Sequence, residues 1–149
     1  MADYFLDTSA VVKRYVQETG TAWIRTLAAS ATGHFIYLAR ITEVEVTSAL
    51  ARRRGQPGLS VAQARTALGL FRQDFAQDYR IAEITMPLLE RAALLADTHT
   101  LRGYDAVQLA AALEVRFQVP LLILISADAD LNTAASAEGL SVEDPNTHP

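Results

Sequence analysis

Short apolar runs alternate along this chain with longer stretches in which apolar residues recur every three or four positions. The runs are residues 4–6, 34–38, 79–83 and 121–125, and residues 140–143 would form a short edge strand. Runs of this length indicate buried strands, whereas the longer spacing indicates helices. Strands that alternate with helices are typical of a three-layer α/β/α fold. We therefore expect a mostly parallel central sheet of four to five strands.

The stretches between the runs carry helix signals at their ends. The helices expected are 9–17, 21–30, 42–54, 60–77, 87–99, 104–117 and 128–138. Pro87 stands where the first turn of a helix tolerates proline. The run 121–125 has no polar residue, which suits a parallel strand buried on both faces. Residues 3–143 are expected to form one domain, followed by a frayed tail over 144–149.

Composition narrows the class of protein. The 149 residues are half hydrophobic and one-fifth charged, as in globular domains. The absence of cysteine excludes disulfides and thiolate metal sites. A net charge of −4 argues against a strongly basic nucleic-acid-binding fold, although twelve of the thirteen basic residues are arginine. No signal peptide or membrane-spanning run is evident, so we expect a cytoplasmic protein without membrane association.

Four acidic residues stand where a parallel sheet would bring them together. Asp7 follows the first run, and Asp128 follows the run 121–125. Glu45 and Asp105 lie in the first turns of expected helices. In a parallel sheet the carboxyl ends of the strands share one edge, and the following helices begin there. Asp7 and Asp128 are therefore expected to meet if their strands are neighbours, and the helices that begin at the same edge could bring in Glu45 and Asp105.

Each acid also has a purely structural interpretation. Asp7 and Asp128 could cap the helices that follow them by accepting a backbone N–H. Glu45 stands three positions after a threonine, which is the spacing of a capping box. Asp105 could pair with Arg102. The helix after Asp105 is apolar nearly all round, however, and a carboxylate is rare in such surroundings unless it is paired or binds a metal.

A cluster of carboxylates has a characteristic ligand. Like charges packed together repel, and a divalent cation removes that repulsion. Oxygen ligands without histidine or cysteine suit Mg²⁺ or Mn²⁺ rather than zinc. In enzymes such ions commonly act on phosphate esters. The acids therefore predict metal-dependent phosphoester chemistry.

Four motifs carry a family resemblance. They are FLDTSA at residues 5–10, TEVEV at 42–46, RGYDA at 102–106 and SADADL at 126–131. In this order and context the chain resembles the PIN-domain nucleases, and within them most of all the VapC toxins of bacterial toxin–antitoxin pairs. The resemblance implies a PIN-like fold over roughly residues 3–143. It also implies an Mg²⁺- or Mn²⁺-dependent endoribonuclease that acts on RNA, forms a homodimer and is inhibited by a cognate antitoxin protein.

The same resemblance assigns roles to individual residues. The catalytic and metal-binding acids would be Asp7, Glu45, Asp105 and Asp128. Glu43 is an alternative to Glu45 because both lie in the second motif. Ser9 would hydrogen-bond to the carboxylate of Asp7, Ser126 stands where the family often has threonine, and Asp130 would assist through water. Candidate contacts to the RNA backbone are Arg14, Arg40 and Arg52, with Arg53 and Arg54 beside them; residues 52–54 could equally be a solvated helix end.

Two other functions compete with this one. The start of the chain half-resembles the phosphatase motif of haloacid dehalogenases, but that motif needs a second acid where Ser9 stands. It also needs a downstream lysine, and none follows Lys13, which argues equally against a receiver domain. The stronger alternative is a PIN fold that binds RNA or a protein without cutting. Four mutually repelling carboxylates argue against a site without activity.

Overall fold

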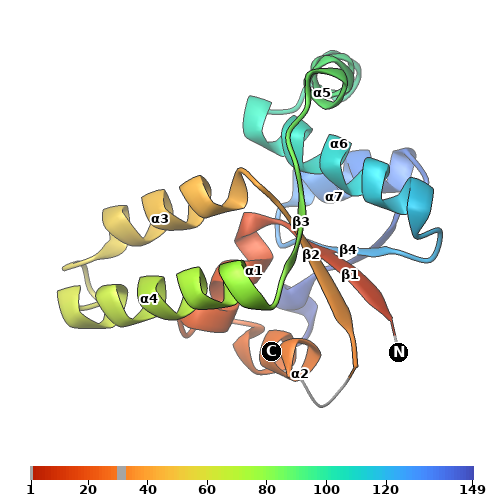
Figure 1. The fold of residues 1–149 in the computed structure, drawn as a ribbon. Helices are drawn as coiled ribbons and strands as arrows, with labels where there is room; N and C mark the ends of the chain where they lie inside the picture. The colour runs from red at the N-terminus through yellow and green to blue at the C-terminus, as the bar shows by residue number, and fades with distance from the viewer. Residues whose placement is uncertain (1, 30–32) are drawn as a thin grey trace.

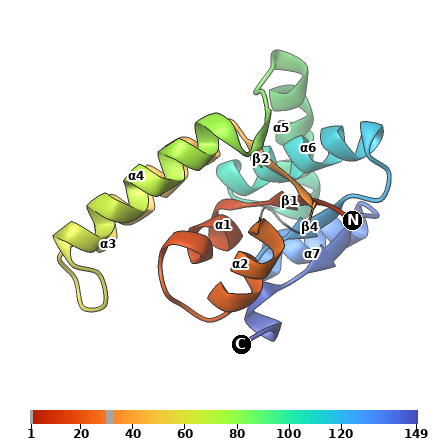
Figure 2. The same ribbon diagram turned by 60° about the horizontal axis from the view of Figure 1, so that its bottom comes forward.

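The computed structural model describes residues 2–29 and 33–149, and a five-stranded parallel sheet forms its centre (Figures 1 and 2). The strands are β1 (Asp3–Leu6), β2 (Phe35–Ala39), β3 (Arg80–Ala82), β4 (Ile123–Ile125) and β5 (Ser141–Glu143). They lie side by side in the order β3-β2-β1-β4-β5, and every pair is parallel. The predicted α/β fold is confirmed, with the N-terminal strand in the middle.

Seven helices connect and cover these strands within the described residues. They are α1 (Thr8–Tyr15), α2 (Thr21–Ala28), α3 (Thr42–Arg53), α4 (Val61–Gln77), α5 (Met86–His99), α6 (Gly103–Gln118) and α7 (Ala129–Ala137). Helices α3 and α4 run beside each other and extend away from the sheet (Figure 1). The prediction that the second helix reaches residue 30 falls at a position outside the described residues. None of the described helices combines the length and apolarity needed to cross a membrane.

Alternate side chains of the central strands build two separate cores. Phe5 and Leu124 point into a core shared with α5, α6 and α7. Leu6 and Ile125 point to the other face, into a core with α1, α2, α3 and α4. Side chains of a strand alternate between the two faces of a sheet, so a strand in the middle of a covered sheet must be apolar at every position. This explains the continuous apolar sequences of residues 4–6 in β1 and of β4.

The strand order determines where a site can form. The chain moves from β1 to β2 and β3 on one side, and β4 then pairs with the free edge of β1. The direction of winding therefore reverses between β1 and β4. The backbone N–H of Asp7 donates to the carbonyl of Ile125 at 3.2 Å, so the carboxyl ends of these two strands lie directly beside each other. Ligands of open α/β sheets bind at such a reversal.

The structure differs from the sequence predictions at the start of β4 and in the C-terminal residues 144–149. Strand β4 begins at Ile123 and not at residue 121, because residues 120 and 121 form a turn that leaves Leu121 87% exposed. Residues 144–149 were expected to be frayed. Instead Pro145–Thr147 form a 3₁₀ turn with Pro145 buried, and the ring of His148 stacks on Trp23 of α2 with centroids 4.0 Å apart.

Gly20 makes the close packing of this 3₁₀ turn possible, and replacing it with alanine should destabilise the protein. Gly20 has φ +88°, and a Cβ there would lie 2.4 Å from the carbonyl oxygen of Pro145. We expect Gly20→Ala to lower the free energy of unfolding by roughly 3 kcal/mol, from backbone strain and the clash together. Denaturant titration checks this value. Gly58→Ala is the control, because Gly58 also has a positive φ of +91° but an added Cβ there would have nothing within 4 Å. Equal losses of stability in both variants would show that the clash with Pro145 contributes nothing.

Candidate active site

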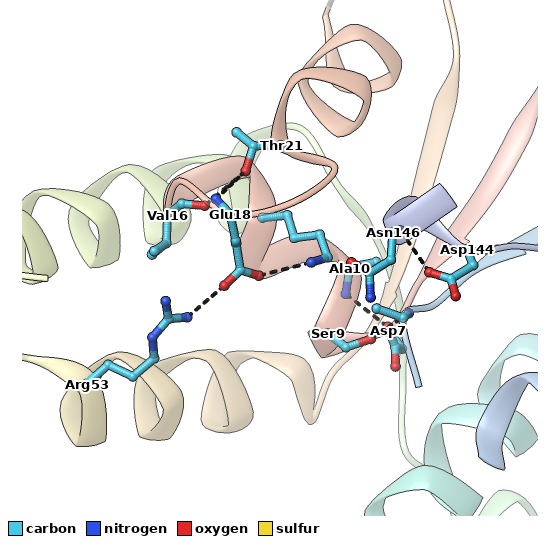
Figure 3. A network of polar contacts seen from close by, with 11 residues as sticks. Asp7, Ser9, Ala10, Val16, Glu18, Thr21, Arg53, Asp144 and Asn146 are labelled. Atoms are coloured by element: carbon cyan, nitrogen blue, oxygen red, sulfur yellow. Dashed lines mark hydrogen bonds and ion pairs between the residues drawn. The ribbon is translucent and has the colours of Figure 1, made fainter. Parts of the chain in front are cut away.

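Asp7 lies at the carboxyl end of β1 and is 4% exposed. Its Oδ1 accepts hydrogen bonds from Ser9 Oγ at 2.7 Å and from the Ala10 N–H at 3.0 Å (Figure 3). Its Oδ2 accepts one from Ser126 Oγ at 3.1 Å. Burial raises the pKa of Asp7 to about 7; the three hydrogen bonds oppose that rise, and the charge of Asp105 adds to it. Asp7 therefore caps α1, as the structural interpretation proposed, and it is also a buried acid of unusual pKa.

The two serines bind the end of β1 to the loop after β4. Ser126 is fully buried, and its Oγ accepts the backbone N–H of Asp128 at 3.1 Å. Ser9 Oγ accepts the N–H of Ala127 at 2.9 Å. Each serine thus donates to the Asp7 carboxylate while accepting a backbone bond from the neighbouring loop. These bonds fix the carboxylate of Asp7 relative to Asp128.

Asp128 caps α7 in the same manner. Its Oδ1 accepts the backbone N–H of Leu131 at 2.9 Å. Its Oδ2 has no hydrogen-bond partner among the described residues. The cap therefore orients the carboxylate and leaves one of its oxygens available.

Glu45 is not part of a capping box, so that structural interpretation is wrong. Helix α3 has Ile41 at its N-cap without a side-chain bond, and the hydroxyl of Thr42 instead accepts from Gln108 Nε2 at 3.0 Å. The Oε1 of Glu45 accepts from Gln108 Nε2 at 2.7 Å and from Thr8 Oγ1 at 3.0 Å. The Glu45 side chain is therefore turned towards α1 and α6.

Asp105 lies half-buried in the first turn of α6. Burial raises its pKa to about 6, and the negative charges of Asp128, Glu45 and Asp130 contribute, against a smaller opposing effect of Arg102. Among the described ion pairs none joins Asp105 to Arg102. The alternative that Asp105 is a structural ion-pair partner is therefore not supported.

The four acids lie near one another but do not form a ready-made metal site. The charge of Asp105 raises the pKa of Asp7, and those of Glu45 and Asp128 raise the pKa of Asp105. Within the described part of the chain, no three acidic or histidine side chains are grouped closely enough to hold an ion. All the donors are oxygens, and their repulsion is of the kind that a hard divalent cation relieves. The residues therefore fit Mg²⁺ or Mn²⁺ by donor chemistry and charge, not by preformed coordination.

Arg14, one of the candidate phosphate contacts, is engaged inside the protein. Its Nη1 donates to the hydroxyl of Tyr79 at 2.8 Å and lies 3.4 Å from Oδ2 of Asp74. Tyr15 joins this network by donating to Asp74 at 2.6 Å. The network connects the end of α1 to the end of α4. The guanidinium of Arg14 therefore has a structural role.

The other arginines lie in different surroundings. Arg40 follows β2 at the carboxyl edge of the sheet and pairs with Glu83, its Nε lying 3.1 Å from Oε2. Arg53 donates to Glu18 at 3.0 Å (Figure 3). The buried Lys13 donates to the other oxygen of Glu18 at 3.3 Å. Arg52 and Arg54 are exposed. Arg40 and Arg52 therefore remain accessible candidates, whereas Arg53 connects α3 to the end of α1.

Sequence reasoning missed the amide and hydroxyl groups around Glu45. Gln108, Thr8 and Thr42 come from three different helices and meet only in the folded protein. One signal was present. Gln108 is a lone polar residue within the apolar part of α6, three positions after Asp105.

Comparison with known proteins places the chain among relatives of similar length. A family model of the PIN domain matches residues 4–137. Ribonuclease VapC45 of Mycobacterium tuberculosis (strain CDC 1551 / Oshkosh) is 33% identical over 138 residues, which cover 93% of this chain and 92% of that protein. The solved structure of VapBC2 from Rickettsia felis bound to a DNA fragment of its promoter has a TM-score of 0.66 and 13% identity, with coverage of 95% and 98%. A toxin–antitoxin complex from Klebsiella pneumoniae has a TM-score of 0.63 and 18% identity, with coverage of 95% and 97%. At these identities the two structures show a shared fold.

Proposed function

The chain belongs to the PIN-domain family, as a relative of the VapC ribonucleases, and on that premise we propose that it is an Mg²⁺- or Mn²⁺-dependent endoribonuclease. The observation that carries the proposal is the electrostatic coupling of four carboxylates at the point where the sheet reverses its winding. Burial and mutual repulsion raise the pKa of Asp7 and of Asp105. Perturbed acids gathered at such an edge are typical of catalytic sites.

The proposed site contains acids that bind the cation and neighbouring residues that orient these acids. Asp7, Glu45, Asp105 and Asp128 would bind Mg²⁺ or Mn²⁺. Once bound, such an ion lowers the pKa of a water molecule and neutralises charge on the phosphate. Ser9 and Ser126 orient Asp7, and the exposed Asp130 would act through water. Glu45 is favoured over Glu43 because its charge raises the pKa of Asp105, and because its Oε1 is held by Gln108 and Thr8.

We further infer a toxin function, with an antitoxin protein as partner and a second copy of this chain in a homodimer. The relatives named as a toxin–antitoxin complex and as VapBC2 support the partner by their fold. A site with four carboxylates would attract an arginine or lysine of an inhibitor, because charge-assisted hydrogen bonds to carboxylates are strong. Arg40 and Arg52 are accessible enough to contact the RNA backbone.

RNA cleavage by the purified chain tests the proposal. The protein is prepared free of any co-expressed antitoxin and offered total RNA with Mn²⁺ or with EDTA. We expect cleavage with Mn²⁺ only. Asp105→Asn should reduce it at least about 100-fold, because the substitution removes a charge from the ion site.

Asp97→Asn is the matched control, since it makes the same change of charge at an exposed position of α5. Cleavage that persists in EDTA or in Asp105→Asn would reject the four-acid site. Binding of Mn²⁺ without cleavage of any RNA would instead favour a PIN fold that binds RNA or a protein without cutting.

A further inference from the structure

Gln108 is a buried polar residue to which the proposed reaction gives no role. It is 1% exposed, and the residues around it on α6, 106–107 and 109–113, are buried and apolar. A polar side chain in such surroundings costs free energy unless hydrogen bonds replace those made with water. The contacts of its amide therefore decide what Gln108 does.

The amide nitrogen of Gln108 contacts the first turns of two other helices. Its Nε2 donates to Glu45 Oε1 at 2.7 Å and to Thr42 Oγ1 at 3.0 Å, both on α3. A longer contact of 3.4 Å reaches Thr8 Oγ1 on α1. Gln108 itself lies one turn after Asp105, so its amide connects the helix that carries one acid to the helix that carries another.

The amide oxygen of Gln108 reveals what fixes this orientation. Its Oε1 is buried and has no hydrogen-bond partner among the described residues. Turning the amide over would place this oxygen 2.7 Å from a Glu45 oxygen, and two acceptors at that distance repel. The side chain therefore keeps one buried acceptor unsatisfied in order to donate to Glu45. An apolar side chain of similar length would pack in this core without that cost.

The Glu45 carboxylate is therefore held through only one of its two oxygens. Both bonds to Glu45, from Gln108 and from Thr8, reach Oε1, and Oε2 has no partner within the described residues. We propose that Gln108 is a positioning residue, which fixes the Glu45 carboxylate through Oε1 and so presents Oε2 to a divalent cation. The inference rests on the proposed metal-dependent function and adds a residue to it.

Gln108→Met tests this inference, because methionine has similar length and neither donates nor accepts strongly. We expect the Mn²⁺ concentration for half-saturation to rise about tenfold, both in calorimetry and in RNA cleavage. The melting temperature of the metal-free protein should change by less than about 4 °C, because the loss of the bond to Thr42 is offset by removal of the unsatisfied Oε1. Leu109→Met, a volume-conserving change at the next buried position, should alter neither quantity.

Repeating the Gln108→Met substitution in a Glu45→Ala variant distinguishes positioning of Glu45 from a general effect on the structure. In Glu45→Ala the group that Gln108 holds is absent, so adding Gln108→Met should shift Mn²⁺ half-saturation less than about twofold. An equal tenfold shift in both backgrounds, or no shift in either, would overturn the inference. Mn²⁺ binding without RNA cleavage by the unaltered chain would overturn the proposed nuclease, while the affinities would still decide the role of Gln108. Absence of any Mn²⁺ binding would overturn both.

Discussion

Asp7→Asn is expected to abolish RNA cleavage and, at the same time, to stabilise the metal-free protein at pH 8. The loss of cleavage should be about 1,000-fold or more, because the substitution removes a negative charge from the proposed ion site. The gain in stability has a separate origin. A charge on Asp7 is expensive in its buried position, and asparagine keeps the size and the Oδ1 acceptor without that charge.

The sign of the stability effect follows from the raised pKa. In the unfolded chain an aspartate has a pKa near 3.9, whereas Asp7 has a pKa of about 7 in the folded protein. The folded state therefore binds more protons between about pH 4 and pH 7, and the free energy of unfolding falls as pH rises through that window. At pH 8 this loss in the free energy of unfolding is about 4 kcal/mol, and Asp7→Asn avoids it because asparagine carries no charge.

Thermal unfolding in the presence of EDTA measures the effect. The melting temperature of Asp7→Asn should exceed that of the unaltered chain by about 8–16 °C at pH 8, and the difference should shrink towards pH 5. Asp130→Asn is the control, because Asp130 is exposed. A variant less stable than the unaltered chain at pH 8 would show that the hydrogen bonds to the ionised carboxylate outweigh its burial.

Mn²⁺ binding should tighten about 100-fold between pH 5.5 and pH 8. A cation binds ionised carboxylates, and with pKa values of about 7 and about 6, Asp7 and Asp105 must first release their protons. Affinity therefore rises as pH passes through these two values and becomes constant near pH 8. The direction is opposite to that of the stability of the metal-free protein, because the ion favours the charged form that burial disfavours.

Calorimetry in two buffers of different ionisation enthalpy tests this prediction directly. At pH 6 the binding of one ion should release between one and two protons, most of them from Asp7. At pH 8 it should release almost none. Affinity that is independent of pH, with no proton release, would contradict the assignment of Asp7 and Asp105 as ligands.

The strands and helices of the fold could be predicted from sequence because each carries its own local signal, whereas the order of the strands in the sheet could not. The apolar runs gave the strands to within one or two residues, and capping and glycine signals gave the helices. The exposed Leu121 shows the limit of such reasoning. The apolar run 121–125 contains no signal that marks the end of the turn and the start of the strand. Only the pairing of β4 with β1 determines that Ile123 is the first residue of the strand.

The candidate site was predictable only as far as topology determines it. Asp7 and Asp128 follow strands, so the shared edge of a parallel sheet predicts that they meet. The environment of Glu45 was not predictable, because the hydroxyl expected to form a capping box with it is bound by a residue 66 positions away. The contacts of Arg14 were not predictable for the same reason. Its partners, Asp74 and Tyr79, belong to a distant helix end that the sequence around Arg14 does not indicate.

The central place of β1 has a consequence for how the protein is made. Tyr4, Phe5 and Leu6 pair with Ile123, Leu124 and Ile125, so β1 is synthesised more than one hundred residues before the strand with which it pairs. Contacts so distant in sequence form slowly, and during synthesis the N-terminal part is exposed before its partner exists. Asp7 receives the hydrogen bond of Ser126 only after that pairing. Until β4 has been synthesised, a nascent chain therefore carries Asp7 without the buried, hydrogen-bonded environment that raises its pKa.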